Sequence, residues 1–368
     1  MLTTTIRRLC CLLLLLLFTP TALQAQVDPI YQEYRSQLEM EYFLPFIAYD
    51  GSFYVATYGK MSSILRDQEL QFVLLASGEE VVNFALGYTW HAPYWSYGLN
   101  LYQMPIYTGP MWSAGFWELQ KGVSLLASRH FNNEKRLDLR LQFEDFSPLS
   151  LPRFPVEKAS ILGFEATATH DNFSFLAQDG HREYFSLGGA FPLLGADFKY
   201  LKAEVDHRNY FSLGRSSLVL SARGGKIWGD YPVQRGFALG GIQQVSMSSL
   251  GTLTNAGILG TLADTVLRGY SEYRFFGDGF LISNIELRLL AWPSSYQKIR
   301  GTAFTLLAFS DAAWVWKGSS QQTSSPSIGV GVGFKFYFFG LNLGLDYGIP
   351  LNTPGEFPKW HFSIGEVF

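Results

Sequence analysis

Residues 328–338, Ile-Gly-Val-Gly-Val-Gly-Phe-Lys-Phe-Tyr-Phe, are the stretch of this sequence that decides the fold. Every second position from Ile328 to Phe338 holds a branched or aromatic side chain, and the positions between hold glycine, Lys335 or Tyr337. Strict alternation is typical of a β-strand, because successive side chains of a strand point to opposite faces. The stretch therefore predicts a strand with one strongly apolar face and one small or polar face.

The same alternation recurs along most of the chain. Segments of this kind, each followed by turn-forming residues, return at roughly 20-residue intervals from about residue 43 onward. We therefore expect about 14 to 16 antiparallel strands. In three clear examples, Leu341, Leu343, Leu345 and Tyr347 oppose Asn342, Gly344, Asp346 and Gly348; Leu137, Leu139, Leu141 and Phe143 oppose Asp138, Arg140, Gln142 and Glu144; and Trp360, Phe362, Ile364 and Phe368 oppose His361, Ser363, Gly365 and Val367.

The N-terminus has the three parts of a secretory signal peptide. Arg7 and Arg8 give a basic start, residues 12–18 are apolar, and Ala22-Leu23-Gln24-Ala25 offers a small-x-x-small cleavage motif, after which the mature chain would begin near Gln26. The apolar run is far shorter than the roughly 20 residues of a membrane-spanning helix. We predict that residues 1–25 are a cleaved signal peptide, and that residues 26–40 form a short N-terminal segment.

Cysteine content and charge exclude several classes of function. Cys10 and Cys11 both lie in the predicted signal peptide, so the mature chain is expected to have no disulfide and no thiolate ligand. Loss of Arg7 and Arg8 changes 28 basic and 31 acidic residues to 26 and 31, a net charge of −5. This acidic balance argues against nucleic acid as a partner.

Two architectures can use strands of this pattern. In a soluble sandwich the apolar faces form the core, whereas in a transmembrane barrel they face lipid and the polar faces line a wet lumen. The export signal, the many aromatic residues on apolar faces and the even strand spacing favour the barrel. We predict an all-β transmembrane barrel of about 16 strands over residues 41–368. Its place is the outer membrane of a Gram-negative-type bacterium, in contact with outer-membrane lipids and lipopolysaccharide.

One interval between predicted strands departs from the regular spacing. About fifty residues, around 230–280, separate two strands, which is far longer than an ordinary connection. Residues 236–263 carry no charge, and Arg268-Gly269-Tyr270 follows them.

With these features the sequence resembles the superfamily of outer-membrane assembly and two-partner secretion barrels, of the BamA, TamA and FhaC type, also called the bacterial surface antigen family. The resemblance covers roughly residues 160–368. It implies that the long loop folds into the lumen and that its R-G-Y tip docks on acidic residues of the following strands. The matching residues are Arg268, Gly269 and Tyr270 at the tip, Glu286 and Phe309-x-Asp311 on the strands, Phe237-x-Leu239-Gly240-Gly241 before the loop, and Trp360, Phe362, Ile364 and Phe368 as the C-terminal barrel signal.

The physical chemistry supports this docking independently of the family. By alternation, Glu286 and Asp311 both fall on the polar side of neighbouring strands. A guanidinium that reaches inward could therefore bridge both carboxylates, since its fork of donors fits two acceptors at once. Gly269 after the arginine would allow a close approach.

The sequence also departs from the family pattern. The periplasmic POTRA modules of the family are not expected, because only about 15 residues precede the first predicted strand. Ala313 replaces the glycine of the F-x-D-x-G motif, and its methyl group would leave less space where the loop tip docks. Arg235-Gly236-Phe237 looks like a second copy of the tip, but we interpret it as a decoy because it precedes the Gly-Gly pair.

Three functions remain open from the sequence. The resemblance implies insertion or translocation of client outer-membrane or secreted proteins, or of lipids, through a lateral seam between the first and last strands, with a separate periplasmic or barrel partner. The second is a structural or pore-forming barrel that passes lipid or small solutes or docks a partner. An enzyme is not expected, because the six histidines stand outside any G-x-S-x-G or H-E-x-x-H motif. The surroundings of His170 and His207 are too sparse for a metal site, and no cofactor is predicted.

Overall fold

The computed structural model describes residues 37–49, 53–77, 81–108, 116–148, 158–172, 179–193, 195–241, 266–271, 274–293, 301–318, 321–322, 325–338, 341–353 and 355–364. The predicted signal peptide and most of the uncharged loop stretch lie outside these residues, as do the last four residues. In the described part of the chain, no helix is long and apolar enough to cross a membrane.

Long antiparallel strands account for most of the described residues. The first eleven are β1 (Glu39–Tyr49), β2 (Phe53–Ser62), β3 (Gln68–Ser77), β4 (Val81–His91), β5 (Trp95–Thr108), β6 (Phe116–His130), β7 (Lys135–Pro148), β8 (Ala159–Asp171), β9 (Gly180–Phe191), β10 (Lys199–Leu213) and β11 (Ser216–Asp230). A 3-10 helix, η2 (Val233–Arg235), comes next, followed by β12 (Phe237–Leu239), β13 (Phe275–Gly277), β14 (Gly279–Trp292), β15 (Thr302–Lys317), β16 (Gln321–Gln322), β17 (Ser327–Phe338), β18 (Leu341–Pro350) and β19 (Lys359–Ile364).

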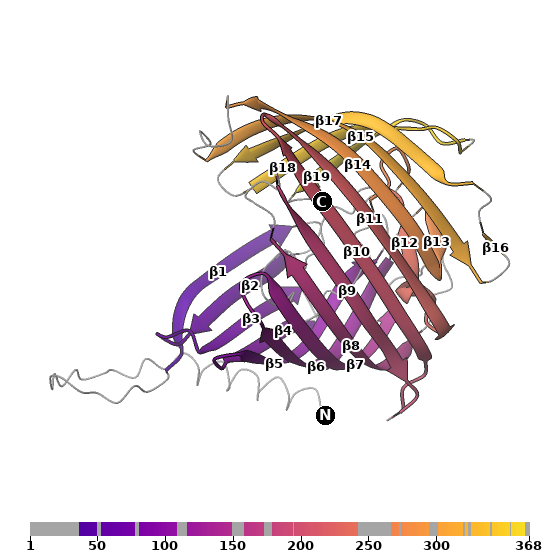
Figure 1. The fold of residues 1–368 in the computed structure, drawn as a ribbon. Coiled ribbons are helices and arrows are strands. Elements are labelled where there is room, and N and C mark those ends of the chain that lie inside the picture. Colours follow the sequence, from indigo (N-terminus) through magenta and orange to yellow (C-terminus); the bar gives the residue numbers. More distant parts are fainter. Residues whose placement is uncertain are drawn as a thin grey trace. The chain divides into compact units, whose positions relative to one another are not determined.

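The strands pair in the order in which they follow one another along the chain (Figure 1). Seventeen strands form one sheet, in which the two-residue β16 pairs only with β15, so sixteen strands make up the continuous series from β1 to β19. The short strands β12 and β13 pair only with each other in a second sheet. The predicted all-β antiparallel architecture with about 16 strands is confirmed.

Side chains alternate between a buried inner face and an exposed, apolar outer face. On β14, Asn284, Glu286 and Arg288 are at most 3% exposed, whereas Leu287 and Leu289 are 49% and 44% exposed. A soluble sandwich would bury the leucines and expose the charges. The observed arrangement is the inverse, and it is the one that a sheet needs when its outer face meets lipid.

The two ends of the strands differ in the length of their connections. One end has the short turns after β2, β4, β6, β10 and β17, together with the longer connections after β8 and β14. The other end has the longest connections, after β7 and β11, together with the short turns after β1 and β3. In bacterial outer-membrane barrels the short turns face the periplasm and the longer loops face outward. We therefore assign the end that holds the β10–β11 turn to the periplasm.

Two described parts of the connection between β11 and β14, residues 233–241 and 266–271, lie against the inner face of the sheet. Arg235 of this connection pairs with Glu144 on β7, and Arg268 pairs with Asp311 on β15. Side chains from strands far apart in the series thus meet the same connecting segment. The inner face therefore surrounds a lumen that this segment enters.

Candidate functional site

Arg268 lies at the centre of a buried cluster of charges. Its side chain is 1% exposed. Nε and Nη2 donate to the two oxygens of Asp311, each at 2.9 Å, and the backbone N–H of Arg268 donates to Asp311 as well. Nη1 donates to Glu286 at 2.8 Å and to Asp346 at 3.3 Å. The guanidinium thus makes a two-pronged contact with one carboxylate and uses its other edge for two more.

The alternation of three strands places the carboxylates around this guanidinium. Glu286 lies on β14, Asp311 on β15 and Asp346 on β18, all on the inner face. Asn284, which is paired with Asp311 in the β14–β15 register, donates both to Asp311 and to the carbonyl of Val266, at 2.9 Å each. The strand register therefore positions the acids that surround the loop arginine.

The charges of this cluster balance. Three carboxylates (Glu286, Asp311, Asp346) face three cations (Arg268, Arg288, Lys335). Arg288 and Lys335 both approach Oε1 of Glu286, at 2.6 and 3.3 Å. A buried charge is tolerated only when it is paired and hydrogen-bonded, so the loop arginine completes a site that would otherwise hold excess negative charge.

The ring of Phe309 covers one face of the Arg268 guanidinium. The guanidinium carbon lies 3.6 Å from the centre of its ring. A planar guanidinium stacks on an aromatic face, and the ring also keeps water from the ion pairs. Burial by itself opposes the charged form, but the adjacent Asp311 and Glu286 more than offset it, so the pKa of Arg268 is raised above its ordinary value. The side chain therefore stays charged at any physiological pH.

Gly269 and Tyr270 seat the loop against the last strands. The N–H of Gly269 donates to Nε2 of His361 on β19 at 2.9 Å, which requires that nitrogen to be unprotonated. The hydroxyl of Tyr270 donates to the carbonyl of Ile328 on β17 at 3.0 Å. Gly269 has a φ of +93°, a conformation that side chains disfavour. The tip is thus held by β14, β15, β17, β18 and β19 together.

Gly240 and Gly241 are the last described residues before the long loop, which is described again from Val266. Gly241 and Leu267 exchange two backbone hydrogen bonds of 3.0 Å, which tie the start of the loop to its tip. Ala313, which replaces the glycine of the family motif, is buried among apolar side chains beneath this tie. The members of this cluster are Ile227, Phe237, Leu239, Leu267, Tyr270, Phe280, Ile282, Ala313 and Val315.

Arg235, which we interpreted from the sequence as a decoy for the tip, has acidic partners that differ from those of Arg268. Its guanidinium forms an ion pair with Glu144 on β7, lies 4.0 Å from Glu118 on β6, and approaches the ring of Phe146 at 5.1 Å. Glu118 and Glu144 are at most 5% exposed in their side chains. Spacing along the sequence gave no sign of this pair, because Glu144 lies 91 residues before Arg235. The connection is therefore held by a second arginine at its beginning.

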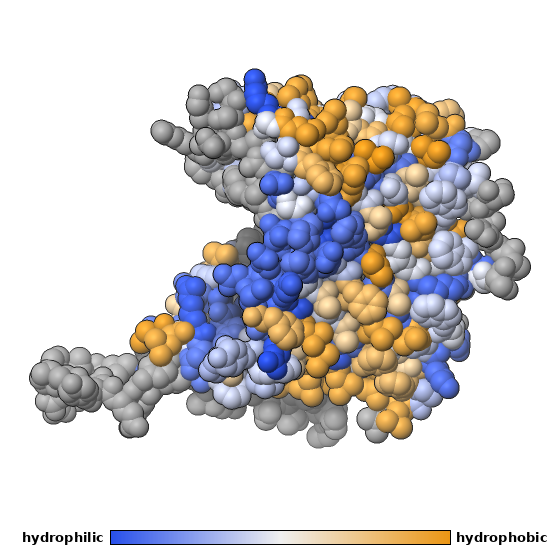
Figure 2. Space-filling view, viewed as in Figure 1, coloured by the Kyte–Doolittle hydropathy of each residue, from blue (hydrophilic) through white to orange (hydrophobic). Residues whose placement is uncertain are grey.

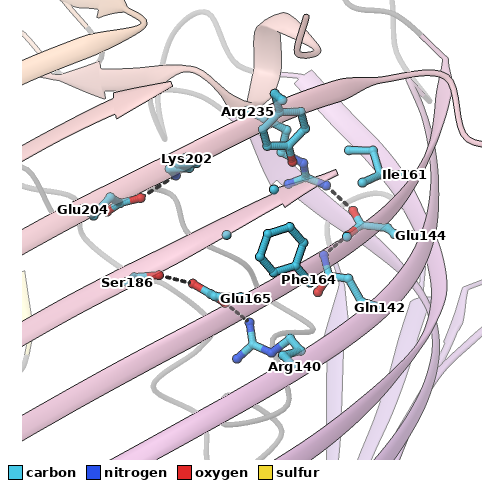
Figure 3. A pocket seen from close by; sticks show the side chains of 14 residues that line it. Arg140, Gln142, Glu144, Ile161, Phe164, Glu165, Ser186, Lys202, Glu204 and Arg235 are labelled. Carbon is cyan, nitrogen blue, oxygen red and sulfur yellow. Dashed lines mark hydrogen bonds and ion pairs between the residues drawn. The ribbon is translucent and has the colours of Figure 1, made fainter. Parts of the chain in front are cut away.

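A pocket lies beside this second arginine (Figure 3). Figure 3 shows Arg235 reaching from its segment to Glu144, with further polar pairs along the wall of the lumen. Arg140 pairs with Glu165 at 2.8 Å, and Lys202 pairs with Glu204 at 2.6 Å. These side chains make the pocket polar, as expected for a lumen that holds water.

Replacing Arg235 by alanine is expected to lower the free energy of unfolding by about 2 to 4 kcal/mol, because Glu144 would be left buried without its partner. The double variant with Glu144→Gln should recover part of this loss. Thermal unfolding in detergent, followed by circular dichroism, measures both. Arg140→Ala removes a more exposed lumen pair and should cost about 1 kcal/mol or less. Equal losses in Arg235→Ala and Arg140→Ala would contradict a special role for the second arginine.

The residues of the C-terminal signal are only partly described. Trp360 and Phe362 lie on β19 and are 64% and 44% exposed on the outer face. Ile364 ends β19, and its side chain, like Phe368, lies outside the described residues. Sequence reasoning did not select Asp346, Lys335 or His361 for the charged site, although all three occupy polar positions of the alternating strands that it identified.

A sixteen-strand sheet with an apolar outer face and a loop held inside by buried ion pairs defines an outer-membrane barrel. The chain belongs to the Omp85 superfamily: residues 112–368 match the model of the Omp85 superfamily domain. It resides in the bacterial outer membrane. Barrels of this superfamily are generally transport and assembly proteins rather than enzymes.

Two solved structures have a similar fold. BamA from Haemophilus ducreyi lacking POTRA domains 1-3 matches with a TM-score of 0.63 and 13% identity, over 89% of this chain and 70% of that chain. CdiB from Acinetobacter baumannii matches with a TM-score of 0.53 and 14% identity, over 89% of this chain and 58% of that chain. The chain therefore spans less than two thirds of the length of CdiB. No curated protein matches the sequence.

Proposed function

We propose that this barrel inserts client proteins into the outer membrane, or secretes them across it, through a seam between β1 and β19. One observation carries the proposal. The registers of the sheet run without interruption from β1 to β19, and in the described residues of these two strands no register joins them to each other. An unpaired strand edge can template the pairing of another strand. A client strand would therefore find its first partner at this seam.

Site-specific photo-crosslinking tests where clients bind. A photoreactive phenylalanine analogue at Leu44 of β1 is expected to capture client chains in living cells, because this side chain lies next to the proposed seam. Leu141 of β7 is a matched control on the opposite part of the series, since the two leucines are 46% and 48% exposed. Mass spectrometry identifies the captured chains. Equal capture at both positions, or no protein adduct at Leu44, would refute the seam.

Depletion identifies the class of client. If the proposal is correct, loss of this protein should lower the amount of a specific subset of outer-membrane or secreted proteins in a quantitative proteome. Surface lipids, measured in the same cells, should change later than the proteins. A change in lipids without any change in proteins would favour lipid transport instead.

A second candidate function is a pore that the loop plugs. It rests on the observation that two described parts of the connection between β11 and β14 are held at the lumen wall, one by Arg235 and the other by Arg268. If the loop is a plug, Arg268→Ala should raise the conductance of the barrel in planar bilayers several-fold, and Arg274→Ala should leave it unchanged. Arg274 is a fair control because its side chain is 46% exposed and pairs outside the buried cluster, with Glu356. Low conductance in all three proteins would favour the insertion factor.

A further inference from the structure

Three histidines and a glutamate meet on the outer face of β8, β9 and β10. Glu183 of β9 is paired in register with His170 on β8 and with His207 on β10. His181 is two residues before Glu183, so the alternation of β9 places both on the same face. The sequence offered no motif for this group, because its members come from three strands.

The surroundings of this group make it unusual. Phe185 and Val205, which follow on the same face, are 48% and 50% exposed, as expected for side chains that meet lipid. Figure 2 shows a hydrophilic patch over this part of the sheet, with apolar surface on both sides of it. Ionisable side chains on the lipid-facing side of a barrel are destabilising, most of all away from the interfaces. The patch lies toward the periplasmic end of β8 and β9, where a charge costs less than at the middle of the membrane and where ions from the periplasm can reach it.

The atoms of the group have the spacing of metal ligands. Nδ1 of His170 lies 3.2 Å from Nε2 of His181 and 3.3 Å from Oε2 of Glu183. Two ligands at about 2.1 Å from a tetrahedral ion are roughly 3.4 Å apart. One ligand atom of each residue lies within 4.8 Å of the others. A single imidazole nitrogen can donate or accept one hydrogen bond, so Nδ1 of His170 cannot bond fully to both neighbours, whereas a cation between the three atoms would contact all of them.

The side chains behind these ligand atoms also fit a metal site. Nε2 of His170 faces the carboxylate of Glu134 at 3.6 Å. A carboxylate behind a ligating histidine orients the ring and makes it a better ligand. The other oxygen of Glu183 lies 3.5 Å from Nδ1 of His207, and Asn209 holds the far nitrogen of His207 at 2.6 Å. Both the first histidine and the carboxylate are thus held from behind.

We propose that His170, His181 and Glu183 bind a divalent transition-metal ion, with Zn²⁺ as the best match to two imidazoles and one carboxylate. Such a ligand set leaves at least one coordination position for water or for a side chain of a partner. The ion would join the end of β8 to the start of β9 and neutralise the carboxylate on the outer face. This site is independent of the proposed function, because it lies on the other side of the sheet from the loop.

Zinc titration of the full-length protein tests the proposal. The protein is purified in detergent with an affinity tag that contains no histidine, stripped with a chelator and titrated with Zn²⁺ in a calorimeter. One ion per chain is expected to bind. His181→Ala and Glu183→Gln should each weaken binding by about 100-fold or more, and Glu134→Gln by about 10-fold, the lower end of the range for a group behind a ligand. His91→Ala is the matched control, because His91 bonds only to Ser96 in the described contacts and should bind zinc as the natural chain does.

Two further measurements keep the result interpretable. Heat-dependent migration of each variant on gels, without zinc, shows whether it is folded, so loss of binding by a misfolded chain is not counted. Zn²⁺ should raise the unfolding temperature of the natural chain and not that of His181→Ala. Ca²⁺ and Mg²⁺ should do neither, because they prefer all-oxygen sites. Absence of zinc binding by the natural chain, or undiminished binding by folded His181→Ala, would overturn the site.

Discussion

Replacing Arg268 by alanine is expected to lower the free energy of unfolding by about 3 to 5 kcal/mol, the largest effect of any single truncation in this barrel. The variant would leave Glu286, Asp311 and Asp346 on the inner face with only Arg288 and Lys335 to balance them. It would also remove the two-pronged contact with Asp311. Urea unfolding from lipid vesicles, together with heat-dependent migration on gels, measures the loss.

Two further variants separate charge from geometry at this site. Arg268→Lys keeps the charge but cannot make the forked contact, so it should lose roughly half as much stability as the alanine variant. Arg274→Ala removes a half-exposed arginine of the same connection and should change stability by about 1 kcal/mol or less. If Arg268→Ala is no less stable than Arg274→Ala, the buried cluster does not hold the loop.

Replacing Gly348 by valine is expected to displace the loop tip from the lumen wall. A Cβ atom at this position of β18 would lie 2.3 Å from the backbone nitrogen of Gly269 and 2.7 Å from its Cα atom. The obstacle is backbone rather than a flexible side chain, so rotamer changes cannot relieve it. The ion pairs of Arg268 would be lost with the tip. We therefore expect a stability loss as large as that of Arg268→Ala, with both changes together costing little more than either one.

Protease accessibility gives a second readout of the same change. The tip should become susceptible to cleavage near Arg268 in Gly348→Val and remain protected in the natural chain. Gly224→Ala on β11 is the control, because a Cβ there meets its nearest neighbour at an ordinary 3.4 Å. If Gly348→Val keeps the tip protected and the barrel equally stable, the close contact between Gly348 and Gly269 does not seat the loop.

The fold class could be predicted from the sequence because its signal is local. Side chains of a strand alternate with a period of two, so the stretch 328–338 predicts a strand without reference to the rest of the chain. The export signal and the aromatic-rich apolar face then indicate which face of the strand meets lipid. The tip Arg268 and its acids Glu286 and Asp311 were predicted from the resemblance to the family, and alternation placed both acids on the polar side of their strands. The structure places these three side chains in contact.

What the sequence by itself determined is therefore the strands, their polar and apolar faces, and the residues of a motif that lie close together along the chain. Only the tertiary structure decided which polar side chains share the lumen: Asp346 joins Arg268 from 78 residues away, and Arg235 meets Glu144 from 91 residues away. It likewise brought His170 of β8 to the histidine and glutamate of β9. The reason is that alternation fixes the face of each residue, whereas the register between strands and the path of the long connection fix its neighbours, and these depend on how the whole sheet closes around its contents.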